Sequence, residues 1–388
     1  MAPLFPGFVA LSASLSALVP SLEQGFNTSS IAKVRTNLLD IASASWELGT
    51  AAQALTELSW PALSVFNASA FPPSSRLSGS AIPADVLDIA NKTVSAKSAD
   101  SLPLIPNQGS AADPASIGVA VLLANWTRAD TRNSAYADAA SDQLEYLLDH
   151  APRSPTGAIS HRANEVQLWA DFIYMVPPFI AYYGALEGGA SGRALLQTAY
   201  DQIRLYRDAL KDESGLWKHI TLGSFQDNTH WATGNAWAAA GMLRVLSTLN
   251  HSSVARQFAS HQANLTEWID EILDASWAHQ TSTGALLNVI DNSTSFVDTA
   301  STALLASVTY RMAVFKNETS RIPVADRAFG LVRRSVDANG WLQNVINPIT
   351  FHDPLPAGEH SPEGQAFVLL LQASWRAFSD YIKRTRTT

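Results

Sequence analysis

The segment HWATGNAWAAAGML, residues 230–243, has a form that recurs along the chain: a polar or aromatic opening, then small residues, then an apolar helical run. Five further segments share this form: SWELGTAAQAL (45–55), DPASIGVAVLLA (113–124), WADFIYMVPPFIA (169–181), VDTASTALLASV (297–308) and SPEGQAFVLLLQ (361–372). Neighbouring segments lie roughly 60 residues apart, which leaves room for two helices and their connections. The repeat therefore predicts six helical hairpins.

Small residues near the start of most of these segments allow helices to approach one another closely. We therefore expect them to be the inner helices of a closed all-α ring, an (α/α)6 barrel, whose polar openings line a cavity at one end. An open superhelix of hairpins is the alternative architecture. Because no linker interrupts the chain after residue 30, we predict a single domain over 21–388.

A second recurring element precedes the later segments. It is a glycine followed by apolar and polar residues, and it begins at Gly157, Gly215, Gly284 and Gly340. Each copy ends in a histidine or an asparagine. The pattern predicts a turn followed by a short extended stretch.

The composition narrows the choice of partners. The chain has 388 residues, of which 47% are apolar, and a formal net charge of −8. Nucleic acids and anionic membranes require basic surfaces, so neither is an expected partner. There are no cysteines, which excludes disulfides and cysteine-based zinc sites.

The N-terminus and the glycosylation sequons indicate export. Residues 1–20 are apolar, lack charge and contain three prolines, so they resemble a secretory signal peptide more than a membrane span. A buried N-terminal segment is the alternative interpretation. Eight Asn-x-Ser/Thr sequons begin at Asn27, Asn67, Asn91, Asn125, Asn250, Asn264, Asn292 and Asn317. We therefore predict a secreted, extracellular glycoprotein.

The polar openings and the glycine-led elements supply the candidate site residues. They are Asp113, His161, Arg162, Trp169, Asp171, Met175, His219, His230, Trp231, Thr233, Asn235, Trp237, His360 and Glu363. Carboxyl groups, imidazoles and tryptophans together are typical of a sugar site, because aromatic faces stack on pyranose rings and carboxyl groups exchange protons near the glycosidic bond. No metal-ligand spacing, phosphate-binding loop or G-x-S-x-G motif accompanies them, so we expect neither a metal nor a cofactor.

The acids among these candidates also have structural interpretations. Asp171 lies within an aromatic run, where an ionised carboxylate is costly unless it is paired. It either caps a helix or takes part in proton transfer. Asp113 precedes Pro114 and fits an N-cap, and Glu363 fits a first-turn acid that interacts with the helix dipole.

Three motifs together resemble glycoside hydrolase family 105, the unsaturated rhamnogalacturonyl hydrolases, which are related to the family 88 unsaturated glucuronyl hydrolases. They are WADFIYMVPPFIAYYG (169–184), GLWKH (215–219) and WATGNAW (231–237), and SPEGQAF (361–367) also fits the last inner helix. The resemblance spans roughly residues 110–375 and implies an (α/α)6 barrel.

The resemblance also implies a reaction and a set of roles. In these families an acid protonates C4 of a 4,5-unsaturated uronate, water adds at C5, and the resulting hemiketal releases the next sugar, without a metal. Asp171 matches the general acid/base and Asp113 a second pocket acid. The resemblance and the polar openings together mark these residues as the substrate-binding set: His161, His219, Trp231, Trp237, Arg162, Met175 and Thr233.

One departure from the family pattern concerns substrate recognition. The family has W-x-R-G-N-G-W, whereas this chain has Thr233 and Ala236 at the two differing positions. A threonine cannot grip a carboxylate bidentately as an arginine does. Arg162 is the candidate to compensate.

We thus expect a monomeric hydrolase that acts on small unsaturated oligosaccharides from pectic, rhamnogalacturonan-type material. Two alternatives stay open. One is a direct inverting glycosidase that uses Asp171 with Asp113 or Glu363 as acid and base. The other is a carbohydrate-binding scaffold without catalysis, which the loss of the arginine would allow.

Overall fold

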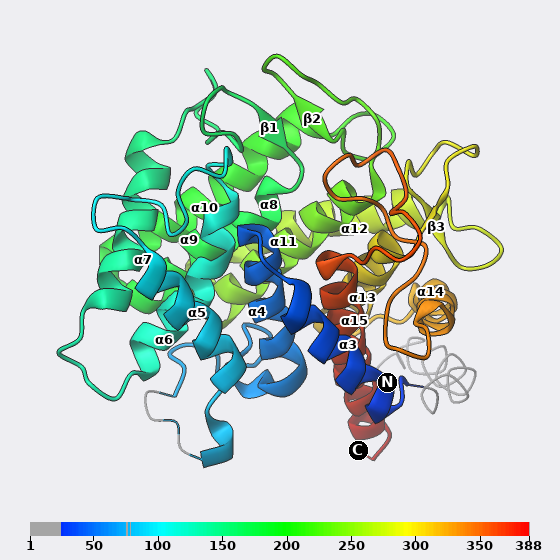
Figure 1. Cartoon of the computed structure of the whole chain (residues 1–388), viewed down its shortest axis with the longest axis horizontal. Helices are drawn as coiled ribbons and strands as arrows, with labels where there is room; N and C mark the ends of the chain where they lie inside the picture. The colour runs from blue at the N-terminus through cyan, green and yellow to red at the C-terminus, as the bar shows by residue number, and fades with distance from the viewer. Residues whose placement is uncertain (1–24, 75–76, 78, 388) are drawn as a thin grey trace, which may run out of the picture.

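The computed structural model describes residues 25–74, 77 and 79–387, and it is mainly helical (Figure 1). The predicted signal peptide at 1–20 lies outside the described residues. The inner helices are α4 (Ser45–Ser59), α6 (Gly118–Thr127), α8 (Phe172–Met175) with α9 (Pro177–Glu187), α11 (Ala232–His251), α13 (Thr299–Lys316) and α15 (Pro362–Thr387). The outer helices are α3 (Thr28–Ile41), α5 (Ala84–Ala96), α7 (Ala135–Glu145), α10 (Gly189–Leu210), α12 (Ala259–Trp277) and α14 (Ile322–Ser335).

The inner helices form a closed ring. In order, α4 contacts α6, α6 contacts α9, and the contacts continue through α11, α13 and α15 back to α4. The outer helix α3 packs chiefly on α15, so the two ends of the chain together complete the sixth hairpin. The predicted all-α (α/α)6 barrel is confirmed, and the open superhelix is excluded for the part of the chain that the structure describes.

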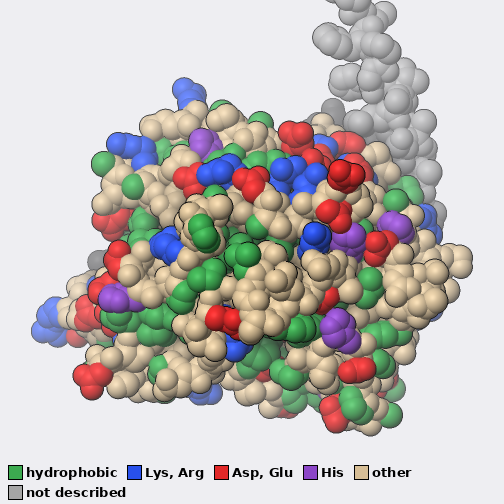
Figure 2. Space-filling view, turned by 90° about the horizontal axis from the view of Figure 1, so that it is seen from above, with side chains coloured by type: hydrophobic (Ala, Val, Ile, Leu, Met, Phe, Trp, Pro, Cys, Tyr) green, Lys and Arg blue, Asp and Glu red, His purple; other side chains and the backbone are tan. Residues whose placement is uncertain are grey.

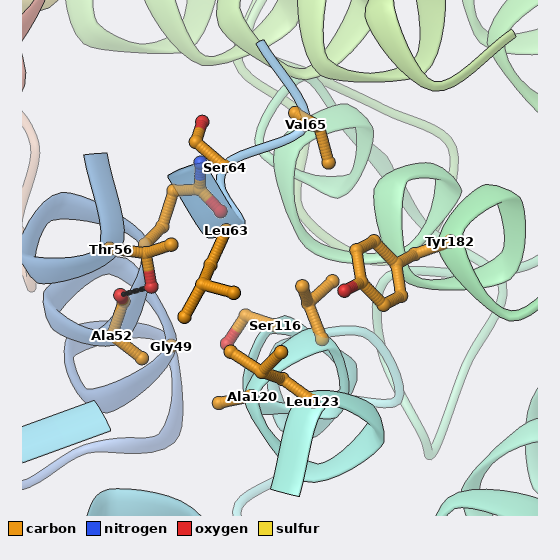
Figure 3. Close-up of a pocket in the computed structure, with 12 residues that line it drawn as sticks. Gly49, Ala52, Thr56, Leu63, Ser64, Val65, Ser116, Ala120, Leu123 and Tyr182 are labelled. Carbon is orange, nitrogen blue, oxygen red and sulfur yellow. Dashed lines mark hydrogen bonds between the residues drawn. The ribbon is translucent and has the colours of Figure 1, made fainter. Parts of the chain in front are cut away.

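Small residues set the close contacts within the ring, as the sequence predicted. A Cβ atom on Gly49 would lie 2.1 Å from Ser116 Oγ, and one on Gly241 would lie 2.0 Å from the carbonyl oxygen of Ile173. Beside the Gly49 contact a cavity of about 10 Å³ remains between α4, α6 and α9 (Figure 3). That volume fits one water molecule at most, so it is a packing defect rather than a sugar site.

Short secondary elements complete the chain. They are η1 (Pro61–Leu63), η2 (Gly79–Ala81), η3 (Asp113–Ile117), η4 (Tyr146–His150), η5 (Ala255–Phe258), β1 (Leu168–Trp169), β2 (Ile220–Thr221), β3 (Leu286–Leu287) and β4 (Val297–Asp298). β1 pairs antiparallel with β2, and β3 pairs antiparallel with β4. These pairs lie in the loops at the end of the ring where the inner helices begin.

The glycine-led elements form as predicted. All four glycines have positive φ, between 87° and 98°, which residues other than glycine rarely adopt. Each is followed by an isolated bridge or a strand, as in the Lys211–Trp217 and Val336–Leu342 bridges. The fifth residue of each element is His161, His219, Asn288 or Asn344.

These four terminal residues attach each element to the start of the preceding inner helix. The carbonyl oxygen of His219 accepts a hydrogen bond from the backbone N–H of Ala170, and that of Asn288 accepts one from Ala232. The carbonyls of His161 and Asn344 make the equivalent bonds to Ala111 and Thr299. Because N–H groups at or just before a helix start have no partner within the helix, these bonds both satisfy them and fix the histidines at the mouth of the ring.

Candidate active site

Asp171 lies between β1 and α8, at the N-cap position, but its side chain makes no capping hydrogen bond. Only 14% of the side chain is exposed. Its Oδ2 atom lies 3.4 Å from His219 Nε2 and has no hydrogen-bond partner among the described residues. The carboxyl group therefore faces an imidazole instead of stabilising its own helix.

His219 lies between two carboxyl groups. Its Nδ1 atom is 3.1 Å from Asp227 Oδ2, on the side of the ring opposite Asp171. Burial alone would lower the pKa of His219, but its close contacts with the carboxyl groups of Asp171 and Asp227 outweigh it and raise the pKa. Asp227 is held in turn by the backbone N–H of Thr229. Burial opposes its ionisation and is the largest single effect, yet the hydrogen bonds with His219 and Thr229 and the charge of His219 together outweigh it, and the pKa of Asp227 falls to about 2.

Aromatic rings surround this chain of groups. Trp231 packs on His219 with 4.4 Å between ring centroids, and Trp169 packs edge-on at 5.4 Å. Phe351 lies 4.7 Å from the His219 ring, on the loop that precedes α15. The rings exclude water from the imidazole and strengthen its interactions with both carboxyl groups.

Asp113 and His161 form a second acid–imidazole pair. Asp113 Oδ1 lies 3.6 Å from His161 Nε2, and His161 stacks on Trp169 at 4.8 Å. Burial raises the pKa of Asp113, and the charge of Asp171 raises it further. Burial lowers the pKa of His161. Asp113 is the first residue of the 3-10 helix η3, and the pair lies close enough to Asp171 to feel its charge.

Arg162 lies at the edge of the same group of residues. Its guanidinium carbon is 6.0 Å from the centroid of the Trp169 ring. It forms no ion pair with any residue that the structure describes. It is therefore a free cation within reach of an anionic ligand at this edge.

Six of the seven residues predicted to bind substrate are almost wholly buried, and three of these six, Thr233, Trp237 and Met175, lie among other core side chains. Thr233 is 0% exposed, and its hydroxyl donates to Asp298 Oδ2 at 3.0 Å. Trp237 packs between Tyr174 and Phe367, with centroid distances of 4.3 and 4.7 Å. Met175 is 2% exposed. Their surroundings are those of core side chains, and a role in substrate binding remains a prediction.

Other sequence candidates have clear partners. Asn235 bonds both backbone groups of Trp217 through its amide, which docks the GLWKH segment on α11. His230 lies between Asp212 and Asp291, at 2.8 Å from each, away from His219's two partners. His360 stacks on Trp341 at 3.8 Å. Glu363 is buried and accepts a hydrogen bond from Trp46 Nε1 at 2.6 Å.

Three residues of the site escaped the sequence analysis: Asp227, Phe351 and Trp46. Asp227 and Phe351 lie in loops outside the six repeated openings, and only folding brings them to His219. Trp46, by contrast, occupies the opening of the first repeat segment, the same kind of position as Trp169 and Trp231. Its place in the repeat was a signal that could have identified it.

The mouth of the ring carries a mixed surface. Figure 2 views the molecule from the end where β1 and β2 lie, and hydrophobic, acidic, basic and histidine side chains are interspersed over this face. No group of three or more potential ligands in the described part of the chain could hold a metal ion. None of the described helices is long and apolar enough to span a membrane.

Comparison with known proteins agrees with this geometry. The family model described as Glycosyl Hydrolase Family 88 matches residues 83–374. The unsaturated rhamnogalacturonyl hydrolase YesR of Bacillus subtilis (strain 168) is 22% identical over 187 residues, which are 46% of this chain and 52% of the relative. The chain thus matches about half the length of that relative.

Solved structures of related families share the fold. A possible member of the GH105 family from Salmonella enterica superposes with a TM-score of 0.71 at 18% identity, covering 90% of this chain and 93% of that chain. The unsaturated glucuronyl hydrolase of Bacillus sp. GL1 gives a TM-score of 0.54 at 15% identity, covering 74% and 78%. At these identities the likeness establishes the helical barrel, and the chemistry must come from the residues of this chain.

Proposed function

Because the chain belongs to Glycosyl Hydrolase Family 88, we propose that it removes 4,5-unsaturated uronic acid from the non-reducing end of lyase-generated oligosaccharides. The observation that carries the proposal is the buried chain Asp171–His219–Asp227, which is enclosed by aromatic rings. We further propose pectic, rhamnogalacturonan-type substrates. The similarity to YesR, an unsaturated rhamnogalacturonyl hydrolase, supports that choice.

Asp171 is the proton donor in this mechanism. Its proton forms the new C–H bond at C4, and the positive charge that develops at C5 is quenched by water. The water proton returns to the Asp171 carboxylate, and the hemiketal opens to release the next sugar. Despite burial, the close contacts with the carboxyl groups of Asp171 and Asp227 raise the pKa of His219, which favours the imidazolium form that stabilises the Asp171 carboxylate between the two proton transfers.

The surrounding residues hold the substrate. The partly exposed Trp169 offers an aromatic face next to the proton donor, as sugar rings require, whereas the buried Trp231 packs on His219. Arg162 is the cation for the uronate carboxylate, because Thr233 is buried against Asp298 and supplies no charge. Asp113 and His161 are close enough to interact with Asp171 and to orient sugar hydroxyl groups.

The decisive measurement is the absorbance of the C4=C5 bond during incubation with unsaturated disaccharides. We expect turnover by the wild type and a loss of ~10²-fold or more in kcat for Asp171→Asn, the usual contribution of a general acid–base group. Asp40→Asn changes an exposed acid on α3 and should behave as the wild type. Normal turnover by Asp171→Asn would refute the assignment.

Direct glycoside cleavage is distinguished by a saturated substrate. The proposed mechanism requires the double bond, so saturated disaccharides should be inert. Anomeric NMR that detects their cleavage with inversion would favour an acid and base acting on the anomeric carbon instead. Tight binding of unsaturated disaccharides without any turnover would favour a binding scaffold.

We also propose that the protein is a secreted, monomeric glycoprotein. The apolar residues 1–20 and the exposed side chains of five sequon asparagines support this: Asn27, Asn91, Asn250, Asn292 and Asn317. Endoglycosidase treatment of protein secreted by a eukaryotic host should reduce its mass. Retention in the cell, or an unchanged mass, would contradict secretion or glycosylation respectively, and light scattering tests the monomer.

A further inference from the structure

Glu363 is a buried acid that the proposed mechanism does not use. It lies in the first turn of α15, on the inner ring between α13 and α4, and is 3% exposed. It does not cap its own helix, because the Ser361 hydroxyl accepts the hydrogen bond from the Gly364 N–H. Its side chain therefore has some other function than stabilising the start of α15.

The two oxygen atoms of Glu363 have different environments. Oε1 accepts a hydrogen bond from the indole N–H of Trp46 at 2.6 Å, and Trp46 is itself partly exposed at the start of α4. Oε2 is buried and has no hydrogen-bond partner among the described residues. A buried polar atom without a partner is unfavourable, which makes Oε2 an open position for a ligand or a water molecule.

The charges around Glu363 decide what Oε2 can do. Burial raises the pKa of Glu363 well above 4.5, and the neighbouring carboxyl groups of Asp171, Glu47 and Asp298 add to the effect, while the Trp46 bond opposes it. These groups come from α4 and from the residues that precede α8 and α13. Burial and the neighbouring carboxyl groups thus favour the protonated form of Glu363, and because Oε1 is an acceptor, the geometry assigns the proton of that form to Oε2.

We propose that Glu363 is a substrate-positioning residue, which donates a hydrogen bond from Oε2 to a hydroxyl oxygen of the unsaturated sugar ring while Trp46 holds its carboxyl group in place. The inference rests on the proposed function. A neutral hydroxyl is the chosen acceptor because Asp171, Glu47 and Asp298 disfavour a second anion there. The uronate carboxylate of the substrate then lies on the side of the sugar ring away from Glu363, toward Arg162.

The test compares Glu363→Gln with Glu363→Ala on unsaturated disaccharides. Glutamine keeps a donor at the position of Oε2, so Glu363→Gln should retain kcat and KM within about threefold. Alanine removes the donor, and KM should rise about tenfold, in keeping with the loss of one hydrogen bond in a buried site. Glu359→Gln alters an exposed acid just before α15 and is the matched control.

The pH dependence separates positioning from a packing role. The wild-type KM should rise on the alkaline side, where Glu363 ionises and loses its donor, whereas the KM of Glu363→Gln should stay constant there. The infrared difference spectrum between the wild type and Glu363→Gln at neutral pH should contain the C=O stretch of one protonated acid, which checks the protonation state of Glu363 without any substrate.

Several outcomes would overturn the inference. They are an unchanged KM in Glu363→Ala, losses in Glu363→Gln as large as those in Glu363→Ala, and an ionised Glu363 at neutral pH. If the wild type turns over unsaturated disaccharides and Asp171→Asn does not, any of these results removes the role of Glu363 alone. A wild type that neither binds nor cleaves these disaccharides refutes the proposed function together with it.

Discussion

The mouth of the ring and its interior hold different sets of ionisable groups. At the mouth, Asp171, Asp298 and Glu363 lie at or within the first turn of inner helices, where helix dipoles favour negative charge. In the C-terminal halves of α11 and α13 lie two arginines instead, Arg244 and Arg311.

Each interior arginine donates at least one hydrogen bond to a fixed acceptor, whereas two of the carboxyl groups at the mouth keep one oxygen without a hydrogen bond among the described residues. Arg311 bonds Glu57 Oε2 at 2.8 Å, and Gln53 donates to the other oxygen of Glu57. Arg244 donates to the carbonyl oxygen of Tyr174 and lies over its ring at 4.7 Å. At the mouth, Asp171 Oδ2 and Glu363 Oε2 have no hydrogen-bond partner among the described residues, although Asp171 Oδ2 lies 3.4 Å from His219 Nε2. The inner helices thus carry two kinds of polar group. Those in their C-terminal halves stabilise the fold, and some of those at the mouth are available for a ligand.

The largest effect is expected from breaking the interior pair. Glu57→Gln leaves Arg311 and Arg244 as buried cations without a counterion, which should lower the free energy of unfolding by ~3–5 kcal/mol. Chemical denaturation measures it, with the exposed Glu213→Gln as control. The kcat of the folded variant should remain close to that of the wild type. A stable variant that loses activity would mean that the interior pair also affects the active site at the mouth.

The next effect tests the close packing of α11 on α8, between the mouth and the interior of the ring. A Cβ atom at Gly241 would meet the backbone of Ile173, which cannot move aside as a side chain can. Gly241→Ala should therefore cost ~1–3 kcal/mol in spite of the better helix propensity of alanine. Gly330→Ala in α14 meets only the flexible end of Arg334 and should be neutral or stabilising. Equal thermal unfolding of the two variants would contradict this account.

A smaller effect is expected at the mouth. Asp227→Asn removes one of the two carboxylates that raise the pKa of His219, so the imidazole should lose its proton at lower pH. We expect kcat to fall about tenfold and its alkaline limb to move to lower pH. Asp212→Asn alters the acid that bonds His230, and it should leave the pH profile unchanged. An alkaline limb that does not move would exclude a role for protonated His219.

The smallest effect concerns Thr233, which is buried in the first turn of α11. Thr233→Val removes one hydrogen bond to Asp298, which still accepts from Ala300, Ser301 and Ile346. The expected loss is ~0.5–1.5 kcal/mol of stability with little change in KM. A large rise in KM for unsaturated disaccharides, with unchanged stability, would show that Thr233 contacts the substrate after all.

The sequence by itself predicted the architecture and the centre of the site. Six copies of one helical pattern predict a ring of hairpins, because each hairpin must bury its apolar face against its neighbours, and the contacts between the first and last inner helices then show that the ring closes. The four glycine-led elements located His161 and His219, since a positive φ at glycine and a fixed spacing are local properties. An isolated carboxyl group within an aromatic run identified Asp171 for a similar local reason.

Only the tertiary structure decided which groups meet. Asp227 reaches His219, Phe351 covers it, and Glu363 bonds Trp46 across 317 residues of chain. It also directed Thr233 and Trp237 into the packed ring, although their motif resembles that of a substrate-binding site. Burial and partner choice depend on distances between distant segments, and these are set when the ring closes, whereas turns and helix periodicity follow from neighbouring residues alone.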